Sequence, residues 1–332
     1  MMQFLKTLLL ISFFSPSMVF AYSSFAQRPD VKSFIQHMVQ KHHFNEQKLA
    51  SLFDTVKAKP EVIENVNHPI EKGAWKSYQP IFINNTHIAE GAQFRKKYHK
   101  ILVQAEKKYR VPGSIIIATL GVETLYGAHS GGYRVLDSLC NISFNHQPRA
   151  AYFQQELEDF LLLTREQHLD PATLQGSYAG AIGAPQFMPS SYRYYAISAT
   201  KKSHIDLIHN IPDAIFSVAN YYHQHGWKTP HFVGMPVTVK GEKYLKLRNA
   251  KGSPIQFSSS HLKKYGITAS RKVPKGYKVK LIELEGSAGK EFWLVFANFD
   301  VIKRYNASNL YAMSVFQLSR HVLTYQKQGS PF

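Results

Sequence analysis

Apolar residues recur every three or four positions over most of the chain, which is the spacing of amphipathic helices. In residues 28–60 this pattern accompanies Asp30 and Asn45, both of which suit a helix N-cap. Three prolines make residues 60–85 a predicted irregular segment. The same periodicity predicts further helices over residues 88–109, 112–127, 149–168, 212–226 and 309–326.

Residues 231–300 follow a different pattern. β-branched and aromatic residues alternate with polar ones, and glycine and proline turns separate the runs. After this segment the chain returns to a helical pattern. The sequence therefore predicts a mainly α protein of the α+β class, with an N-terminal α domain and a small β-rich insert.

The N-terminal residues have the composition of an export signal. Lys6 supplies a positive charge, an apolar run follows, and residues 19–21 fit a signal-peptidase site. The run is short and interrupted, which disfavours a membrane span, although an uncleaved anchor is the alternative. The single cysteine, Cys140, lies far from this site, so neither lipid attachment there nor an intramolecular disulfide is expected. We predict a signal peptide over residues 1–21 and a periplasmic protein.

The protein is strongly basic, with 40 Lys and Arg residues against 22 Asp and Glu residues and a formal net charge of +18. Such a surface concentrates polyanions, among them nucleic acid, anionic lipid and acidic cell-wall polymers. The basic residues are spread along the chain, and helix-turn-helix, zinc-finger and RNA-binding motifs are absent from the sequence. We therefore expect no nucleic-acid partner.

One carboxylate has apolar neighbours. In the helix predicted after Pro112, Glu123 shares a face with Ile116 and Leu120. An apolar environment disfavours the charged form of a carboxyl group, so its pKa rises and it can donate a proton to a glycosidic oxygen. The alternative is a structural glutamate that pairs with a buried arginine or caps a neighbouring helix.

A second candidate segment, residues 176–192, mixes small Gly and Ala residues with Ser, Tyr, Gln and Phe. Small residues let a bulky ligand approach the backbone, and the amide and the rings offer hydrogen bonds and stacking surfaces. An ordinary glycine-rich turn is the alternative. Residues 304–311 are a further candidate segment, and the alternative for them is an ordinary cap of the last helix.

Other motifs point weakly to different chemistry. Residues 128–132 imitate the nucleophile elbow of a serine hydrolase, but they follow a helix rather than a strand. The glycines of residues 127–132 have P-loop spacing without the lysine that should follow. His223 and His225 diverge on a helix, so they do not chelate a metal jointly. We reject all three interpretations.

Five segments resemble, in family order, the signature blocks of the membrane-bound lytic murein transglycosylase B family. These segments are GVETLYG, SFNHQPRAAYF, GSYAGAIGAPQFMPSSY, DAIFSVANYYHQHGW and RYNASNLYAMSVFQL, and the resemblance covers roughly residues 30–325. It implies a lysozyme-like core flanked by an α domain and a small β domain. The expected parts are an N-terminal α domain (22–97), a catalytic core (98–230), a β-rich domain (231–300) and a helical segment that returns to the core (301–332).

The resemblance also implies roles for single residues. Glu123 matches the family's single catalytic acid, and Ser177 matches the hydroxyl group near it. Arg149 matches one basic residue of the family's PRRA segment, but Pro148 precedes it here, which weakens the expectation of two arginines that hold a peptide stem. The positions that match glycan-binding residues are Gln186, Phe187, Tyr221, Tyr305, Asn306 and Tyr311.

We expect neither a cofactor nor a metal. Some members of the family carry an EF-hand-like calcium loop after the SSY sequence. Here Ser198, Thr200 and Lys202 stand where oxygen ligands are expected, and Asp206 alone does not make a site. A lysine ammonium group in the loop also opposes a divalent cation.

The implied chemistry needs one carboxylate. Glu123 protonates the oxygen between N-acetylmuramic acid and N-acetylglucosamine in peptidoglycan, then takes the proton of the muramoyl C6 hydroxyl, so that a 1,6-anhydro ring closes. The nearest alternative is a hydrolytic muramidase, whose second carboxylate would come from Asp137, Glu156 or Asp159. A non-catalytic cell-wall-binding protein is the alternative from another class. We expect the protein to act as a monomer on peptidoglycan glycan strands.

Overall fold

The computed structural model describes residues 24–200, 204–229, 232–273 and 275–327. The predicted signal peptide lies outside these ranges, as does Lys202 of the predicted metal-free loop. Within them, no helix combines the length and the hydropathy needed to span a membrane. The chain divides into two compact units, Met1–Val56 and Lys57–Phe332.

The described part of the first unit is helical. It consists of a 3-10 turn η1 (Phe25–Gln27) and the helices α1 (Pro29–His42) and α2 (Glu46–Asp54). The Asn45 side chain accepts a hydrogen bond from the backbone N–H of Lys48 at 2.9 Å, which confirms the predicted cap of α2. The cap predicted at Asp30 is wrong, because α1 already begins at Pro29, whose fixed φ suits a first helical turn.

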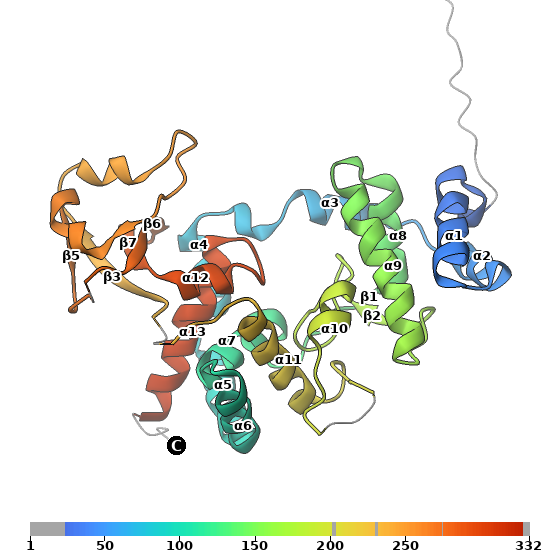
Figure 1. Ribbon diagram of the computed structural model, residues 1–332, viewed down its shortest axis with the longest axis horizontal. Helices are drawn as coiled ribbons and strands as arrows, with labels where there is room; N and C mark the ends of the chain where they lie inside the picture. The colour runs from blue at the N-terminus through green and yellow to red at the C-terminus, as the bar shows by residue number, and fades with distance from the viewer. Residues whose placement is uncertain (1–23, 201–203, 230–231, 274, 328–332) are drawn as a thin grey trace, which may run out of the picture. The chain divides into compact units, whose positions relative to one another are not determined.

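The second unit carries the remaining helices (Figure 1). In chain order they are α3 (Pro60–Asn67), α4 (Trp75–Phe82), α5 (Asn85–Lys97), α6 (His99–Tyr109), α7 (Gly113–Thr124), α8 (Val135–Asn145), α9 (Ala150–Glu166), α10 (Pro189–Tyr195), α11 (Ile211–Gln224), α12 (Ala297–Ile302) and α13 (Asn309–Lys327). The 3-10 turns are η2 (Ile70–Lys72), η3 (Gln147–Arg149), η4 (Lys243–Leu247) and η5 (Ser259–Tyr265).

The predictions for residues 60–85 and for residues 88–109 need correction. Residues 60–85 are largely helical rather than irregular, because Pro60 occupies the first position of α3, where a missing N–H costs no hydrogen bond. Trp75 and Tyr78 bury their rings and thereby hold α4 against the core. The single helix predicted over residues 88–109 is two helices, α5 and α6, that meet at Tyr98.

Helix α7 is buried on nearly every side. It packs against α5, α6, α11 and α13, and Ile116, Ile117 and Leu120 are each at most 1% exposed. The pattern of apolar residues therefore predicts the helix correctly, but it does not single out one inward face. The helix ends at Thr124, and its C-cap Leu125 adopts the left-handed conformation with φ 49°, two residues before the predicted stop at Gly127.

The alternating segment forms an antiparallel sheet of five strands in the order β4-β6-β7-β3-β5. These strands are β3 (Gly234–Val239), β4 (Phe257–Ser258), β5 (Ile267–Ala269), β6 (Lys278–Gly286) and β7 (Gly289–Val295). The sheet has a hydrophobic core of its own, built around residues such as Leu247, Val279 and Leu294. The strands predicted in residues 231–300 are confirmed, and the chain returns from them through α12 to α13 (Figure 1).

A second, very short sheet joins two loops of the helical core. Tyr133–Arg134 (β1) pairs antiparallel with Gln175–Gly176 (β2). Beside it, Gly131 has φ +99°, and a Cβ atom at this position would lie 2.1 Å from the carbonyl oxygen of Gly176. Only glycine allows the two backbones to approach this closely without strain.

Replacement of this glycine should therefore destabilise the protein. We expect Gly131→Ala to lower the free energy of unfolding by about 1–3 kcal/mol, since the new methyl group clashes with backbone and φ is strained. Gly132→Ala is the matched control, because nothing lies within 4 Å of its added Cβ. Chemical denaturation of both variants measures the difference, and equal stabilities would contradict the role of Gly131.

Candidate active site

The carboxyl group of Glu123 lies near the C-terminal end of α7 and is half-buried. The hydroxyl group of Tyr311, on α13, donates a hydrogen bond to Oε1 of Glu123 at 2.5 Å. Tyr311 is 2% exposed, so this bond is screened from solvent. The structure thus joins two predicted site residues that are 188 positions apart in the sequence.

Tyr311 belongs to a cluster of aromatic rings. The rings of Tyr305 and Tyr311 are stacked, with centroids 6.2 Å apart and planes at 13°. Tyr305 also contacts Phe187 and Tyr221, at centroid distances of 5.7 and 4.8 Å. Burial, followed by the negative charge of Glu123, raises the pKa of both Tyr305 and Tyr311 well above its usual value. These phenols therefore remain neutral hydrogen-bond donors at any physiological pH.

The hydroxyl groups of this cluster bond to backbone. Tyr221 donates to the carbonyl oxygen of Arg304 at 2.6 Å, and Tyr305 donates to that of Pro185 at 2.5 Å. Phe187 is only 2% exposed and Tyr221 only 7%. The cluster therefore fixes the backbone segments on which its own members lie.

The loop over residues 176–187 is held in place from several sides. Thr124, at the end of α7, donates to the carbonyl oxygen of Ala184 at 2.7 Å. Gln186 adopts a left-handed conformation with φ 49°, and its Nε2 donates to the carbonyl oxygens of Ser130 and Gly183 at 3.0 Å. A left-handed non-glycine residue costs conformational energy, so these bonds stabilise an unusual turn next to α7.

The other predicted site residues make local contacts. The Ser177 hydroxyl accepts hydrogen bonds from the backbone N–H groups of Ala179 and Ala181, at 3.2 and 3.0 Å. Oδ1 of Asn306 accepts one from the backbone N–H of Ser308. Arg149 is exposed, and its guanidinium lies over the rings of Tyr152 and Phe153, 5.2 and 4.9 Å from their centroids. Ser177 and Asn306 therefore order their own loops, while Arg149 presents a positive charge at the surface.

The three candidates for a second catalytic carboxylate are all held by protein groups. Asp137 accepts hydrogen bonds from Arg134 and from the backbone of Lys57. Glu156 accepts two from Ser190, through its N–H and its hydroxyl group. Asp159 pairs with Arg193, which also binds Glu166. Each of these carboxylates stabilises the fold in the structure.

The loop between α10 and α11 uses its carboxylates in the same way. Asp213 is 1% exposed, and its two oxygens accept the backbone N–H groups of Ala199 and Asp206 at 2.7 and 3.1 Å. Asp206 in turn accepts the N–H groups of Ile208 and His209. Both oxygens of Asp213 and one oxygen of Asp206 therefore already hold backbone of the described residues 198–200 and 204–210, which disfavours their use as calcium ligands.

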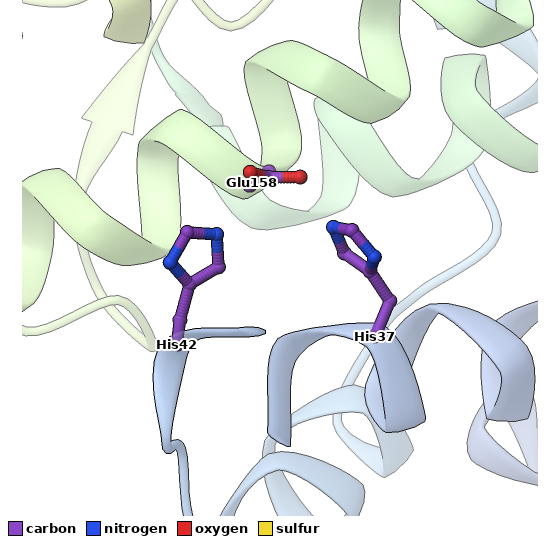
Figure 2. A group of neighbouring side chains, drawn as sticks. All are labelled: His37, His42 and Glu158. Carbon is purple, nitrogen blue, oxygen red and sulfur yellow. The ribbon is translucent and has the colours of Figure 1, made fainter. Parts of the chain in front are cut away.

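Two histidines of the first unit also lie close together. His37 and His42 are both on α1, and their ring centroids are 6.2 Å apart (Figure 2). Glu158, the third side chain labelled in Figure 2, belongs to α9 of the second unit. Two imidazoles are fewer than the three or four protein ligands of a usual zinc centre, so this pair alone does not define one.

The comparisons with known proteins agree with this architecture. Residues 26–320 match the family model of the transglycosylase SLT domain. The chain is 36% identical over 314 residues to the membrane-bound lytic murein transglycosylase B of Escherichia coli, covering 90% of this chain and 84% of that protein.

Two solved structures are similar in both sequence and fold. The soluble lytic transglycosylase SltB1 of Pseudomonas aeruginosa superposes with a TM-score of 0.81 at 38% identity, covering 91% of this chain and 100% of that one. The Escherichia coli lytic transglycosylase Slt35 in complex with calcium gives 0.83 at 37% identity, covering 92% and 96%.

These matches define the class of protein: a peptidoglycan-acting enzyme with a lysozyme-like, mainly α fold. The chain belongs to the SLT-domain lytic murein transglycosylases, as the five signature blocks indicated. The predicted family and fold class are therefore confirmed.

The loop between α10 and α11 is the segment in which the sequence predicts no calcium site. We expect calcium to leave the melting temperature unchanged, because Asp206 and Asp213 are already bonded to backbone N–H groups. A ligand that binds only the folded state must raise the melting temperature, by an amount that grows with its concentration. Thermal unfolding with added calcium, and after treatment with a chelator, measures this. A rise of several degrees with calcium would show that the loop does bind the ion.

Proposed function

We propose that this enzyme cleaves the β-1,4 bond between N-acetylmuramic acid and N-acetylglucosamine with Glu123 as the only acid and base. The observation that carries the proposal is the hydrogen bond from the buried Tyr311 to Oε1 of the half-buried Glu123. It fixes one carboxyl oxygen, so a proton carried by the carboxyl group sits on Oε2. From there Glu123 donates it to the glycosidic oxygen.

The same group then acts as the base. After the bond breaks, Glu123 is a carboxylate that accepts the hydrogen bond of Tyr311 and takes the proton of the muramoyl C6 hydroxyl. The acetamido group of the substrate stabilises the positive charge that develops at C1. Ring closure gives a 1,6-anhydro sugar and consumes no water. A hydroxyl group tethered to the reacting sugar has a far higher effective concentration than a loosely held water molecule.

A hydrolytic route requires a second carboxylate that activates water. Asp137, Glu156 and Asp159 are bonded to Arg134, Ser190 and Arg193, respectively, and all three are less than 5% exposed. To activate a water molecule, any of them would have to leave these partners. This arrangement supports internal attack by C6 over hydrolysis.

The remaining predicted residues are assigned supporting roles. Ser177, Gln186 and Asn306 shape the loops that hold the glycan, while Phe187, Tyr221 and Tyr305 form the aromatic support behind Glu123. Arg149 is exposed and suits the carboxylates of the peptide stems. These assignments extend the family's pattern to the contacts of this chain.

The setting of the enzyme follows from its substrate. We propose that the signal peptide directs the protein to the periplasm, where it acts as a monomer on peptidoglycan strands. It needs neither calcium nor another cofactor. The net charge of +18 attracts the acidic stems of the polymer.

Removal of the acid should abolish cleavage. We expect Glu123→Gln to reduce the rate on purified peptidoglycan by at least about 100-fold, because the amide has no proton of suitable acidity. Its melting temperature should stay near that of the wild type, since an amide oxygen still accepts the hydrogen bond of Tyr311. Glu285→Gln, on the exposed surface of β6, is the matched control and should retain full activity. A turbidity assay that finds Glu123→Gln nearly as active as wild type would exclude this glutamate as the acid.

The product distinguishes a lyase from a hydrolase. We expect muropeptides that end in 1,6-anhydro-N-acetylmuramic acid, each lighter by one water than the hydrolytic product. Mass spectrometry of the digest without a reducing step measures this difference. A digest dominated by reducing-end sugars would identify a muramidase instead.

A further inference from the structure

Two 3-10 turns, η4 and η5, pack on the hydrophobic core of the five-stranded sheet, in the orange part of Figure 1. A 3-10 helix has three residues per turn, so side chains three positions apart share one face. In η4 the buried pair is Tyr244 and Leu247, and in η5 Leu262 and Tyr265 pack against the same core. The two turns also contact each other. The residues between these positions therefore face away from the core.

Most of these outward residues, and one in the connecting loop, are lysines. Residues 240–265 contain seven Lys and Arg residues and a single acidic residue, Glu242. Arg248 is bound to Glu283 at 2.6 Å. Five exposed lysines, in contrast, form no ion pair with an acidic residue of the described ranges. They are Lys243, Lys246, Lys251, Lys263 and Lys264.

Two large aliphatic side chains are exposed in the same segment. Leu245, in η4, is 47% exposed, and Ile255, in the connecting loop, is 39% exposed. Their backbone segments adjoin, because the N–H of Ile255 donates to the carbonyl oxygen of Leu247 at 2.9 Å. A single exposed aliphatic residue is common on a protein surface. Here two of them lie among lysines that have no acidic partner, and we call this set of five lysines and two aliphatic residues the basic face.

The combination of lysines and aliphatic side chains suits a lipid bilayer better than a soluble polyanion. A polyanion is attracted by the lysines alone and offers no hydrocarbon to Leu245 or Ile255. A bilayer with anionic lipids offers both partners, since its phosphate groups attract the lysines and its acyl chains take up the aliphatic side chains. The proposed periplasmic setting also places the protein between two membranes.

We propose that the basic face docks this protein on the surface of a bilayer that contains anionic phospholipids. Each lysine near such a surface increases the affinity about fivefold, so several of them together with two aliphatic side chains give reversible binding. The inference goes beyond the cleavage reaction and does not depend on the role proposed for Glu123.

Vesicle binding tests the proposal. The protein recovered after export is mixed with vesicles of phosphatidylcholine that contain about one third phosphatidylglycerol, or with vesicles of phosphatidylcholine alone, and the bound fraction is measured by co-sedimentation. We expect at least about tenfold tighter binding to the mixed vesicles at low salt, and a loss of this difference as the ionic strength rises. Equal binding to both kinds of vesicle would overturn the proposal.

Two kinds of variant separate the charge of the basic face from its apolar contacts. Lys243→Gln/Lys246→Gln/Lys251→Gln should weaken binding to the mixed vesicles at least about tenfold, because three of the lysines lose their attraction to phosphate. Leu245→Ser should weaken it several-fold, and this loss should persist at high salt, since salt does not screen an apolar contact. All four side chains are exposed, so the melting temperature should not change.

Matched controls come from α5 and α6. Lys96→Gln/Lys100→Gln/Lys107→Gln removes the same charge from exposed lysines outside the basic face. Val103→Ser removes an aliphatic side chain that is 49% exposed on α6. Both controls should change vesicle binding less than about threefold, because charges more than a Debye length from the bilayer are screened and Val103 does not reach the acyl chains.

The outcomes decide between a bilayer and other partners. The proposal is overturned if the basic-face variants bind mixed vesicles as tightly as wild type, or if the controls lose as much affinity as they do. A loss of binding to purified peptidoglycan, with vesicle binding unchanged, would assign the basic face to the polymer instead. All of these variants should cleave a soluble muropeptide at the wild-type rate, so the activity of Glu123 is tested separately.

Discussion

The hydrogen bond between Tyr311 and Glu123 requires that α13 lie against α7, and much of the architecture serves this contact. A carboxyl group that is half-buried needs a partner, or its burial costs stability in the charged form. The partner comes from the last helix of the chain, after the five-stranded sheet. The sheet can be inserted between α11 and α13 without disturbing this contact because it has its own hydrophobic core.

The need to hold the carboxyl group of Glu123 in place also explains why the loop beside α7 makes so many hydrogen bonds. Thr124, Gln186 and Tyr305 each bond to a backbone carbonyl oxygen of the loops around Glu123, and two of these three carbonyls belong to the segment 184–185. A loop held only by exposed contacts would move relative to the carboxyl group. Here the turn at Gln186 is anchored to α7 on one side and to the segment between α12 and α13 on the other, so the backbone beside the carboxyl group of Glu123 is held from both sides.

The sequence predicts the helices and strands of this fold better than it predicts their ends and the contacts between them. Periodicity identifies α7 and α13, and alternation identifies the sheet, because both patterns follow directly from the geometry of a helix and a strand. It fails at residues 60–85, where proline was interpreted as a helix breaker although Pro60 stands at a position that tolerates it. Boundaries such as the end of α7 at Thr124 depend on tertiary contacts that no local pattern contains.

In the candidate site, too, the sequence identifies some residues and misses others. Glu123 and the tyrosines that follow it in the signature blocks could be named from the sequence, and their resemblance to the family suggested contacts with sugar. Thr124 could not be named in this way, because a threonine in an apolar helix looks like an ordinary core residue, yet its hydroxyl group holds the neighbouring loop at Ala184.

The burial of Tyr311, which would reduce its value as a surface for sugar, makes it a directed donor to Glu123. In the proposed mechanism, the aromatic residues of the signature blocks therefore serve the carboxyl group of Glu123 as well as the glycan.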